Sequence, residues 1–112
     1  MGSIIRAVCK SCGYEKELKL GGGKLDFHYY CGFPALNKTM NRIEDRNIYQ
    51  RDRDKKHPSH ILFYDDKTLI DKKSIRSKDH LQWGKYTLYD ANYYCPKCKK
   101  FDVKFHFWGC FD

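Results

Sequence analysis

The chain has 112 residues, which is the length of one domain with a modest hydrophobic core. Its 22 Lys and Arg against 14 Asp and Glu give a formal net charge of +8, so acidic partners such as nucleic acid are favoured. No apolar run approaches the roughly 18 to 20 residues of a membrane-spanning helix, and the first residues are too quickly polar for a signal peptide. We therefore expect a cytoplasmic protein, with no membrane partner, in a reducing compartment.

Four of the six cysteines form two pairs near opposite ends of the chain, Cys9 with Cys12 and Cys95 with Cys98. A spacing of two intervening residues turns both thiolates of a pair toward one ion, and two such pairs complete a tetrahedral zinc site. Four sulfurs leave no position for water, so the zinc would be structural. Iron in the same ligands is the alternative. The crowded lysines and the lack of a glycine after Cys98 argue against it.

Extended segments flank each cysteine pair. Residues 4–8 precede the first pair and residues 13–20 follow it, while residues 86–94 and 101–107 flank the second pair. A strand, a two-cysteine turn and a second strand form the hairpin of a zinc ribbon. In the last segment, alternation predicts one core face and leaves His106 and Trp108 on the opposite face. The core face would comprise Phe101, Val103, Phe105 and Phe107.

The middle of the chain is less regular. Glycines 21–23 separate the first hairpin from another extended segment at 25–30. Leu36, Met40 and Ile43 fall at helical spacing and predict a short helix over residues 35–45, with a strand at 47–50 after it. Beyond these, we expect a solvated charged loop at 51–56, a strand at 60–64, and a polar segment with a helical turn or two at 65–82.

Two further turns repeat the spacing of the cysteine pairs, Asn37 with Met40 and His57 with His60. The order of the four turns suggests an outer ribbon with a second ribbon nested inside it, whose ligands have been replaced. Because Asn and Met are poor zinc ligands, the inner ribbon would bind no zinc, or bind it weakly through the two histidines. The simpler alternative is that residues 57–60 are an ordinary turn before a strand.

Several short motifs of the chain occur together: Cys9 and Cys12 followed by Gly13-Tyr14-Glu15-Lys16-Glu17-Leu18, glycines 21–23, Pro34-Ala35-Leu36, and Tyr94-Cys95-Pro96-Lys97-Cys98 through Gly109-Cys110. In these motifs the chain resembles small, largely uncharacterised bacterial proteins with two zinc ribbons. The resemblance covers the ends well and the middle loosely, and it implies a ribbon fold and bound zinc without implying an activity. The chain departs from it where such proteins would be expected to carry cysteines, at Asn37, Met40, His57 and His60.

These patterns predict a mainly β, small α+β fold of one domain, residues 1–112. Zinc-ribbon hairpins from residues 1–30 and 84–112 would join the two termini around one structural Zn²⁺, and residues of about 31–83 would form a central β and helical insertion. A second metal site is a further possibility, formed by His28, Cys31, His106 and Cys110. The alternative favoured by their aromatic neighbours is that both cysteines are buried core residues.

The sequence contains no P-loop, no zinc-protease motif and no deaminase motif, so we predict a protein that is not an enzyme and has no small-molecule substrate. We expect an accessory or regulatory protein that engages nucleic acid or a ribonucleoprotein, since lysine neutralises phosphate and an exposed ring stacks on a base. The alternative is a protein-docking inhibitor or adaptor from a mobile element, similar to anti-CRISPR proteins, acting on a nuclease complex. The candidate binding residues are Lys72, Lys73, Arg76, Lys78, Lys97, Lys99, Lys100 and Trp108, with Lys104 near the second cysteine pair.

Overall fold

The computed structural model describes residues 2–23, 28–55 and 58–111, apart from the side chains of residues 78 and 79. The protein is mainly β, as predicted, and its helices are short. The elements in chain order are β1 (Gly2–Cys9), β2 (Glu15–Leu20), β3 (Gly32–Asn37), β4 (Arg42–Asn47), α1 (Ile48–Asp52), β5 (Ile61–Phe63), the 3-10 helices η1 (Lys67–Leu69) and η2 (Lys72–Ser74), β6 (Ser77–Trp83), β7 (Tyr86–Asp90), β8 (Tyr93–Tyr94) and β9 (Phe101–Phe111).

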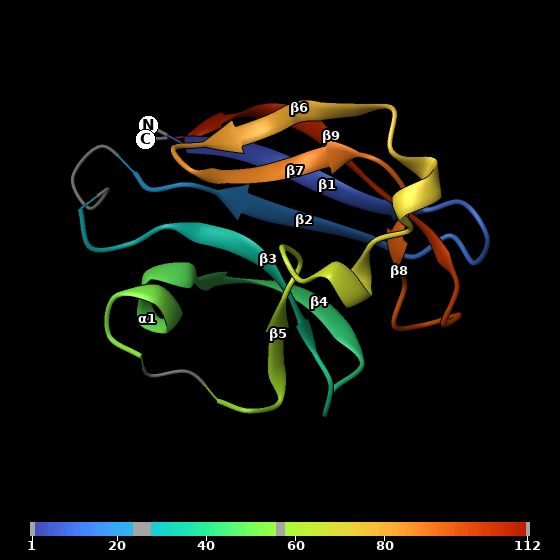
Figure 1. The fold of residues 1–112 in the computed structure, drawn as a ribbon, viewed down its shortest axis with the longest axis horizontal. Coiled ribbons are helices and arrows are strands. Elements are labelled where there is room, and N and C mark those ends of the chain that lie inside the picture. Colours follow the sequence, from blue (N-terminus) through green and yellow to red (C-terminus); the bar gives the residue numbers. More distant parts are fainter. Residues whose placement is uncertain (1, 24–27, 56–57, 112) are drawn as a thin grey trace.

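The first sheet joins the two ends of the chain in the order β2-β1-β9-β8. Strand β1 pairs antiparallel with β2 and with β9, in a register that places Gly2 opposite Phe111 and Cys9 opposite Val103. The two ends of the described chain therefore lie side by side (Figure 1). Alternate residues of β1, Ile5 and Ala7, are fully buried, which is the pattern of a strand with one face on the core.

The second sheet has the order β4-β3-β5 and corrects the predicted helix over residues 35–45. Leu36 and Ile43 are opposite each other across the β3–β4 hairpin, so their spacing of seven reflects strand pairing. The Asn37 side chain accepts hydrogen bonds from the N–H groups of Thr39 and Met40, at 3.1 and 3.0 Å. This local turn replaces the helical hydrogen bonds that the same residues would otherwise form.

The strand predicted at 47–50 is wrong beyond its first residue, because Asn47 ends β4 and residues 48–50 begin α1. Asn47 caps this helix by accepting a hydrogen bond from the Tyr49 N–H, which is a favoured arrangement at a helix start. The predicted solvated loop after it is also partly wrong, because Arg51 is half-buried and donates two 2.7 Å hydrogen bonds to Asp65. The strand predicted at 60–64 is confirmed by β5, and two 3-10 turns and β6 occupy the ambiguous segment after it.

The β6–β7 hairpin lies over β1 and β9 and turns at Gly84, which has a φ of 58° (Figure 1). Between the hairpin and the other strands, Tyr64, Tyr93 and Phe105 form an aromatic cluster with ring centroids 5.0 to 5.9 Å apart. The predicted core face of β9 is correct only at its centre. Val103 and Phe105 are buried, whereas Phe101 and Phe107 are exposed by 38% and 56%.

Candidate metal centre

The pairing of β1 with β9 brings both cysteine turns to one end of the first sheet. Cys9 is the last residue of β1, and Cys12 lies in the turn that leads to β2. Cys95 directly follows β8, and Cys98 lies in the turn that leads to β9. Because β1 and β8 are the two neighbours of β9, these turns meet on the right of Figure 1, at the end of the sheet opposite the chain ends.

The four sulfur atoms have the spacing of ligands around one metal ion. The Sγ atoms of Cys9 and Cys98 are 3.6 Å apart, as are those of Cys12 and Cys95, and all four lie within 4.8 Å of one another. A tetrahedral site with zinc–sulfur bonds of 2.3 Å would hold its sulfurs about 3.8 Å apart. The four predicted ligands are thus together, and the chemistry of the set fits a metal such as zinc.

The two cysteine turns have the same backbone. The N–H groups of Gly13 and Lys99 donate to the carbonyl oxygens of Cys9 and Cys95, at 3.0 and 2.8 Å. Gly13 and Lys99 both have a positive φ, 77° and 61°. The second turn therefore forms without a glycine after Cys98, because Lys99 adopts the left-handed conformation at that position.

Burial and backbone hydrogen bonds have opposite effects on the pKa values of Cys9 and Cys95, the two buried cysteines of the site. Burial alone would raise the pKa of Cys9, but hydrogen bonds from the backbone of Cys12 and Ser11 outweigh it and lower the pKa to about 7. At Cys95, burial dominates and raises the pKa to about 12. Since a metal binds the thiolate, binding of an ion at this site would release protons.

The first set of residues suggested for a second metal is not brought together. Cys31 is fully buried and burial raises its pKa to about 11, whereas His28, His106 and Cys110 are exposed. Within the described part of the chain, the four-cysteine cluster is the one group of three or more such side chains close enough to share an ion. The other suggested pair is His57 and His60; His57 lies outside the described residues, so that pair stays a prediction.

Three of the predicted basic residues line two neighbouring hollows. Lys73 and Arg76 line a hollow of about 290 Å³ together with Lys10 and Lys104, which we call the basic hollow. Lys72 instead lines a larger cleft beside it. Lys10 was not among the predicted residues, because only the pairing of β1 with β9 brings it near Lys104.

The remaining candidates lie around the second cysteine turn or at the far part of β9. The Lys97 ammonium is 5.7 Å from the centroid of the Tyr14 ring, and Lys99 and Lys100 are exposed in the turn itself. Trp108 is 61% exposed, as predicted, and the Arg6 guanidinium lies 4.3 Å from its ring centroid. The side chain of Lys78 lies outside the described residues.

Comparisons with protein-family models, curated proteins and solved structures find no match to this chain. The resemblance to two-ribbon zinc proteins therefore stays a prediction, and the site has to be interpreted from its own chemistry. None of the helices that the structure describes is long and apolar enough to cross a membrane.

Proposed function

We propose that this protein is a non-enzymatic zinc protein, in which the four-cysteine centre is structural and the adjacent basic surface binds nucleic acid. The centre supports zinc because it offers four sulfur ligands at tetrahedral spacing. Such a set fills the coordination sphere, so no position is left for a reacting water. Structural zinc supplies about 10 to 16 kcal/mol of apparent folding free energy, which is comparable with the whole stability of a domain of this size.

The observation that carries nucleic-acid binding is the basic hollow. Lys10, Lys73, Arg76 and Lys104 converge on it, and none of its described lining residues is acidic. Two carboxylates nearby in the sequence are not among its lining residues: Asp71 accepts a hydrogen bond from the Lys73 N–H, and Asp102 accepts one from the Ser11 hydroxyl. Concentrated positive charge of this kind attracts phosphate.

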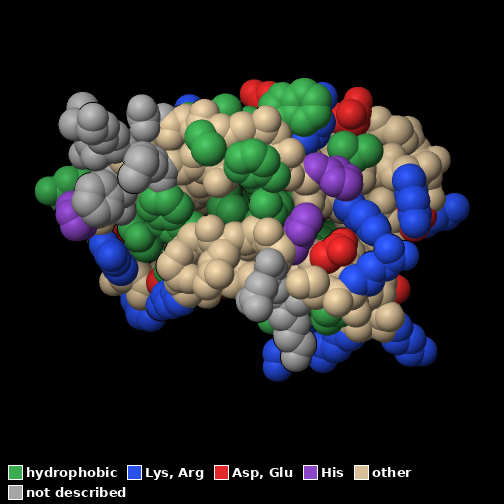
Figure 2. All heavy atoms as spheres, turned by 90° about the horizontal axis from the view of Figure 1, so that it is seen from above, with side chains coloured by type: hydrophobic (Ala, Val, Ile, Leu, Met, Phe, Trp, Pro, Cys, Tyr) green, Lys and Arg blue, Asp and Glu red, His purple; other side chains and the backbone are tan. Residues whose placement is uncertain are grey.

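The metal centre and the hollow are linked through the backbone. Lys10 directly follows Cys9, and its N–H donates to the carbonyl of Asp102 in β9, at 3.2 Å. Lys104 lies two residues further along β9. In Figure 2, Lys and Arg side chains gather toward the right-hand end of the face, the end at which the cysteine turns lie in Figure 1. The metal would therefore hold in place Lys10, directly after β1, and Lys104 on β9, which are two of the four cations of the hollow.

A matched pair of charge-reversal variants tests the binding surface. Lys73→Glu with Arg76→Glu removes two cations from the hollow, while Lys16→Glu with Lys38→Glu makes the same change in charge at exposed positions outside it. We expect labelled single-stranded nucleic acid to bind the wild-type protein at low salt, measured by fluorescence anisotropy. The hollow variant should bind at least about tenfold more weakly than the control, with a salt slope lower by about 0.7 for each phosphate contact removed.

If the two variants bind equally, the assignment of the hollow to nucleic acid is wrong. If the wild-type protein does not bind at micromolar concentration and low salt, the second candidate function, a protein-docking inhibitor or adaptor, takes its place. It is favoured by the exposed aromatic side chains of Phe107 and Trp108 on β9. In that case, the Trp108→Ser variant should lose a protein that the wild-type chain captures from its source cell.

A further inference from the structure

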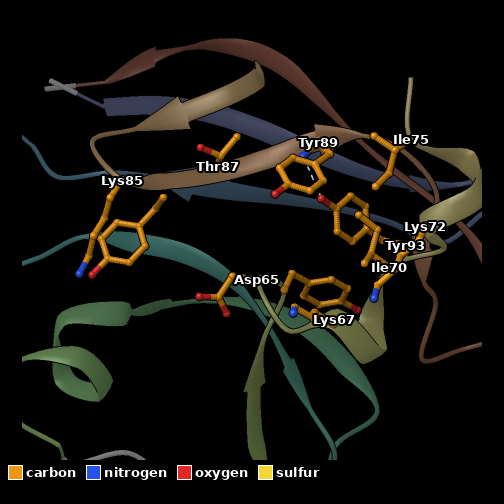
Figure 3. A pocket seen from close by; sticks show the side chains of 11 residues that line it. Asp65, Lys67, Ile70, Lys72, Ile75, Lys85, Thr87, Tyr89 and Tyr93 are labelled. Carbon is orange, nitrogen blue, oxygen red and sulfur yellow. Dashed lines mark hydrogen bonds between the residues drawn. The ribbon is translucent and has the colours of Figure 1, made fainter. Parts of the chain in front are cut away.

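A second, larger hollow lies beside the basic hollow and is lined by tyrosines. Its volume is about 530 Å³, within the range of small-ligand sites, and we call it the tyrosine cleft (Figure 3). Ile75 lines both hollows, and η2 supplies Lys72 to the cleft and Lys73 to the basic hollow. The two hollows are therefore neighbours across a single turn of the chain.

Among the tyrosines that line the cleft, Tyr89 has the most exposed side chain. Tyr64, Tyr86 and Tyr93 are buried. Their hydroxyl groups also form hydrogen bonds. Tyr64 donates to the Tyr94 carbonyl at 2.8 Å, Tyr86 donates to Asp52 at 2.8 Å, and Tyr93 accepts from the Tyr89 N–H at 2.9 Å. Tyr89 is half-buried, and Figure 3 shows its ring beside Tyr93 on the wall that β7 contributes. The buried rings thus form a rigid support, and Tyr89 forms the accessible surface.

The charge around the tyrosine cleft is positive. Lys67, Lys72 and Lys85 are exposed at its rim. The one carboxylate among its described lining residues is Asp65, whose two oxygens accept hydrogen bonds from Arg51 at 2.7 Å each. A ligand for this cleft should therefore combine a flat aromatic group, which stacks on Tyr89, with negative charge, which the lysines neutralise.

We infer that the ligand is single-stranded nucleic acid, with one base stacked on Tyr89 in the tyrosine cleft and the adjoining phosphates crossing η2 into the basic hollow. This inference rests on the proposed function and specifies its ligand. A base within a duplex is stacked between its neighbours and cannot enter a cleft of this kind, whereas a single strand presents free base faces. A polymer also accounts for two adjoining hollows, one suited to a ring and the other to phosphate.

The test separates base stacking from phosphate binding. Anisotropy is measured with a labelled oligothymidine and with a strand of the same length in which every base is replaced by an abasic spacer. We expect Tyr89→Ala to weaken oligothymidine binding by at least about fivefold and to leave abasic-strand binding unchanged. Tyr89→Phe keeps the ring and should bind as the wild-type protein does. Metal content and circular dichroism of each variant establish that it is folded.

A second measurement needs no variant. A strand containing 5-bromouracil is cross-linked to the wild-type protein by light, and the product is mapped by peptide mass spectrometry. We expect the cross-link at Tyr89. A cross-link elsewhere, equal binding of duplex and single strand, or an unchanged affinity of folded Tyr89→Ala would overturn the cleft assignment while nucleic-acid binding itself stands. If the wild-type protein binds neither strand, the proposed function and this inference fail together.

Discussion

Within the residues that the structure describes, one kind of tight turn occurs three times, twice around a sulfur and once around an amide oxygen. Cys9 and Cys95 each accept backbone hydrogen bonds from the second and third residues after them. The Asn37 oxygen does the same with Thr39 and Met40. In each turn, the fourth residue after the acceptor has a positive φ, at Gly13, Asn41 and Lys99.

The strands around these turns are also arranged alike. In both the first and the second sheet, a hairpin (β1–β2 or β3–β4) is joined on its first strand by a later strand, β9 or β5. The two sheets differ in what stabilises the turn end. In the first sheet, four sulfurs meet there, whereas in the second sheet Asn37 donates to Glu44, at 3.0 Å, and Arg46 donates to the same carboxylate, at 2.6 Å. An amide oxygen thus holds the single turn of the second sheet, whereas four sulfurs meet where two turns of the first sheet come together.

The largest effect should follow from removing a ligand of the metal. Cys95→Ser should lose the ion and unfold the first sheet, because the binding free energy of such a site, about 10 to 16 kcal/mol, is part of the folding free energy. Elemental analysis and circular dichroism, with and without a strong chelator, measure the loss. Cys110→Ser is the control, since Cys110 is exposed and lies outside the cluster. A folded, chelator-resistant Cys95→Ser variant would contradict the structural role of the metal.

A smaller effect should follow from removing the oxygen of the inner turn. Asn37→Ala leaves two N–H groups without their acceptor and removes one of the donors to Glu44, and an unsatisfied buried group costs about 1 to 3 kcal/mol. Urea denaturation should show this loss while the metal content stays unchanged. Thr39→Ala, at an exposed position of the same turn, should have little effect. Loss of the metal from Asn37→Ala would show that the two turns are not independent.

The smallest effects should come from the residues with positive φ. A side chain at Gly13 meets no atom within 4 Å, so Gly13→Ala should cost only the conformational term, about 1 to 2 kcal/mol. Lys99→Gly should stabilise the protein by less than this amount, since relief of the left-handed conformation is partly offset by the greater chain entropy of glycine. Thermal unfolding of the metal-loaded proteins measures both changes. If Gly13→Ala and Lys99→Gly changed the thermal stability in the same direction, the two turns would not be equivalent.

The ends of the chain could be predicted from the sequence because their signals are local. The cysteine spacing and the alternation around Val103 and Phe105 depend on residues that are close in the sequence. The inner hairpin was missed because Leu36 and Ile43 are separated by seven residues, a spacing that also suits a helix, and the choice depends on the turn formed by Asn37.

No local sequence pattern of this kind predicts the two hollows. Lys10 and Lys104 meet through strands from opposite ends of the chain, and Tyr89 reaches η2 only because the β6–β7 hairpin folds over the first sheet. Each of these residues alone is an ordinary surface lysine or half-buried aromatic residue. Their combination depends on tertiary structure, so the sequence could indicate basic and aromatic character without indicating which residues act together.

The pairing of β1 with β9 has a mechanical consequence. Its open end is the Gly2 and Phe111 pair, and its closed end is Cys9 opposite Val103, beside the four sulfurs. Tension applied to the two ends of the chain would peel the antiparallel pairs apart one after another, as in the opening of a zipper, rather than shearing them together. The four cysteines lie at the end of this strand pair that would separate last, so a metal bound there would resist the applied force.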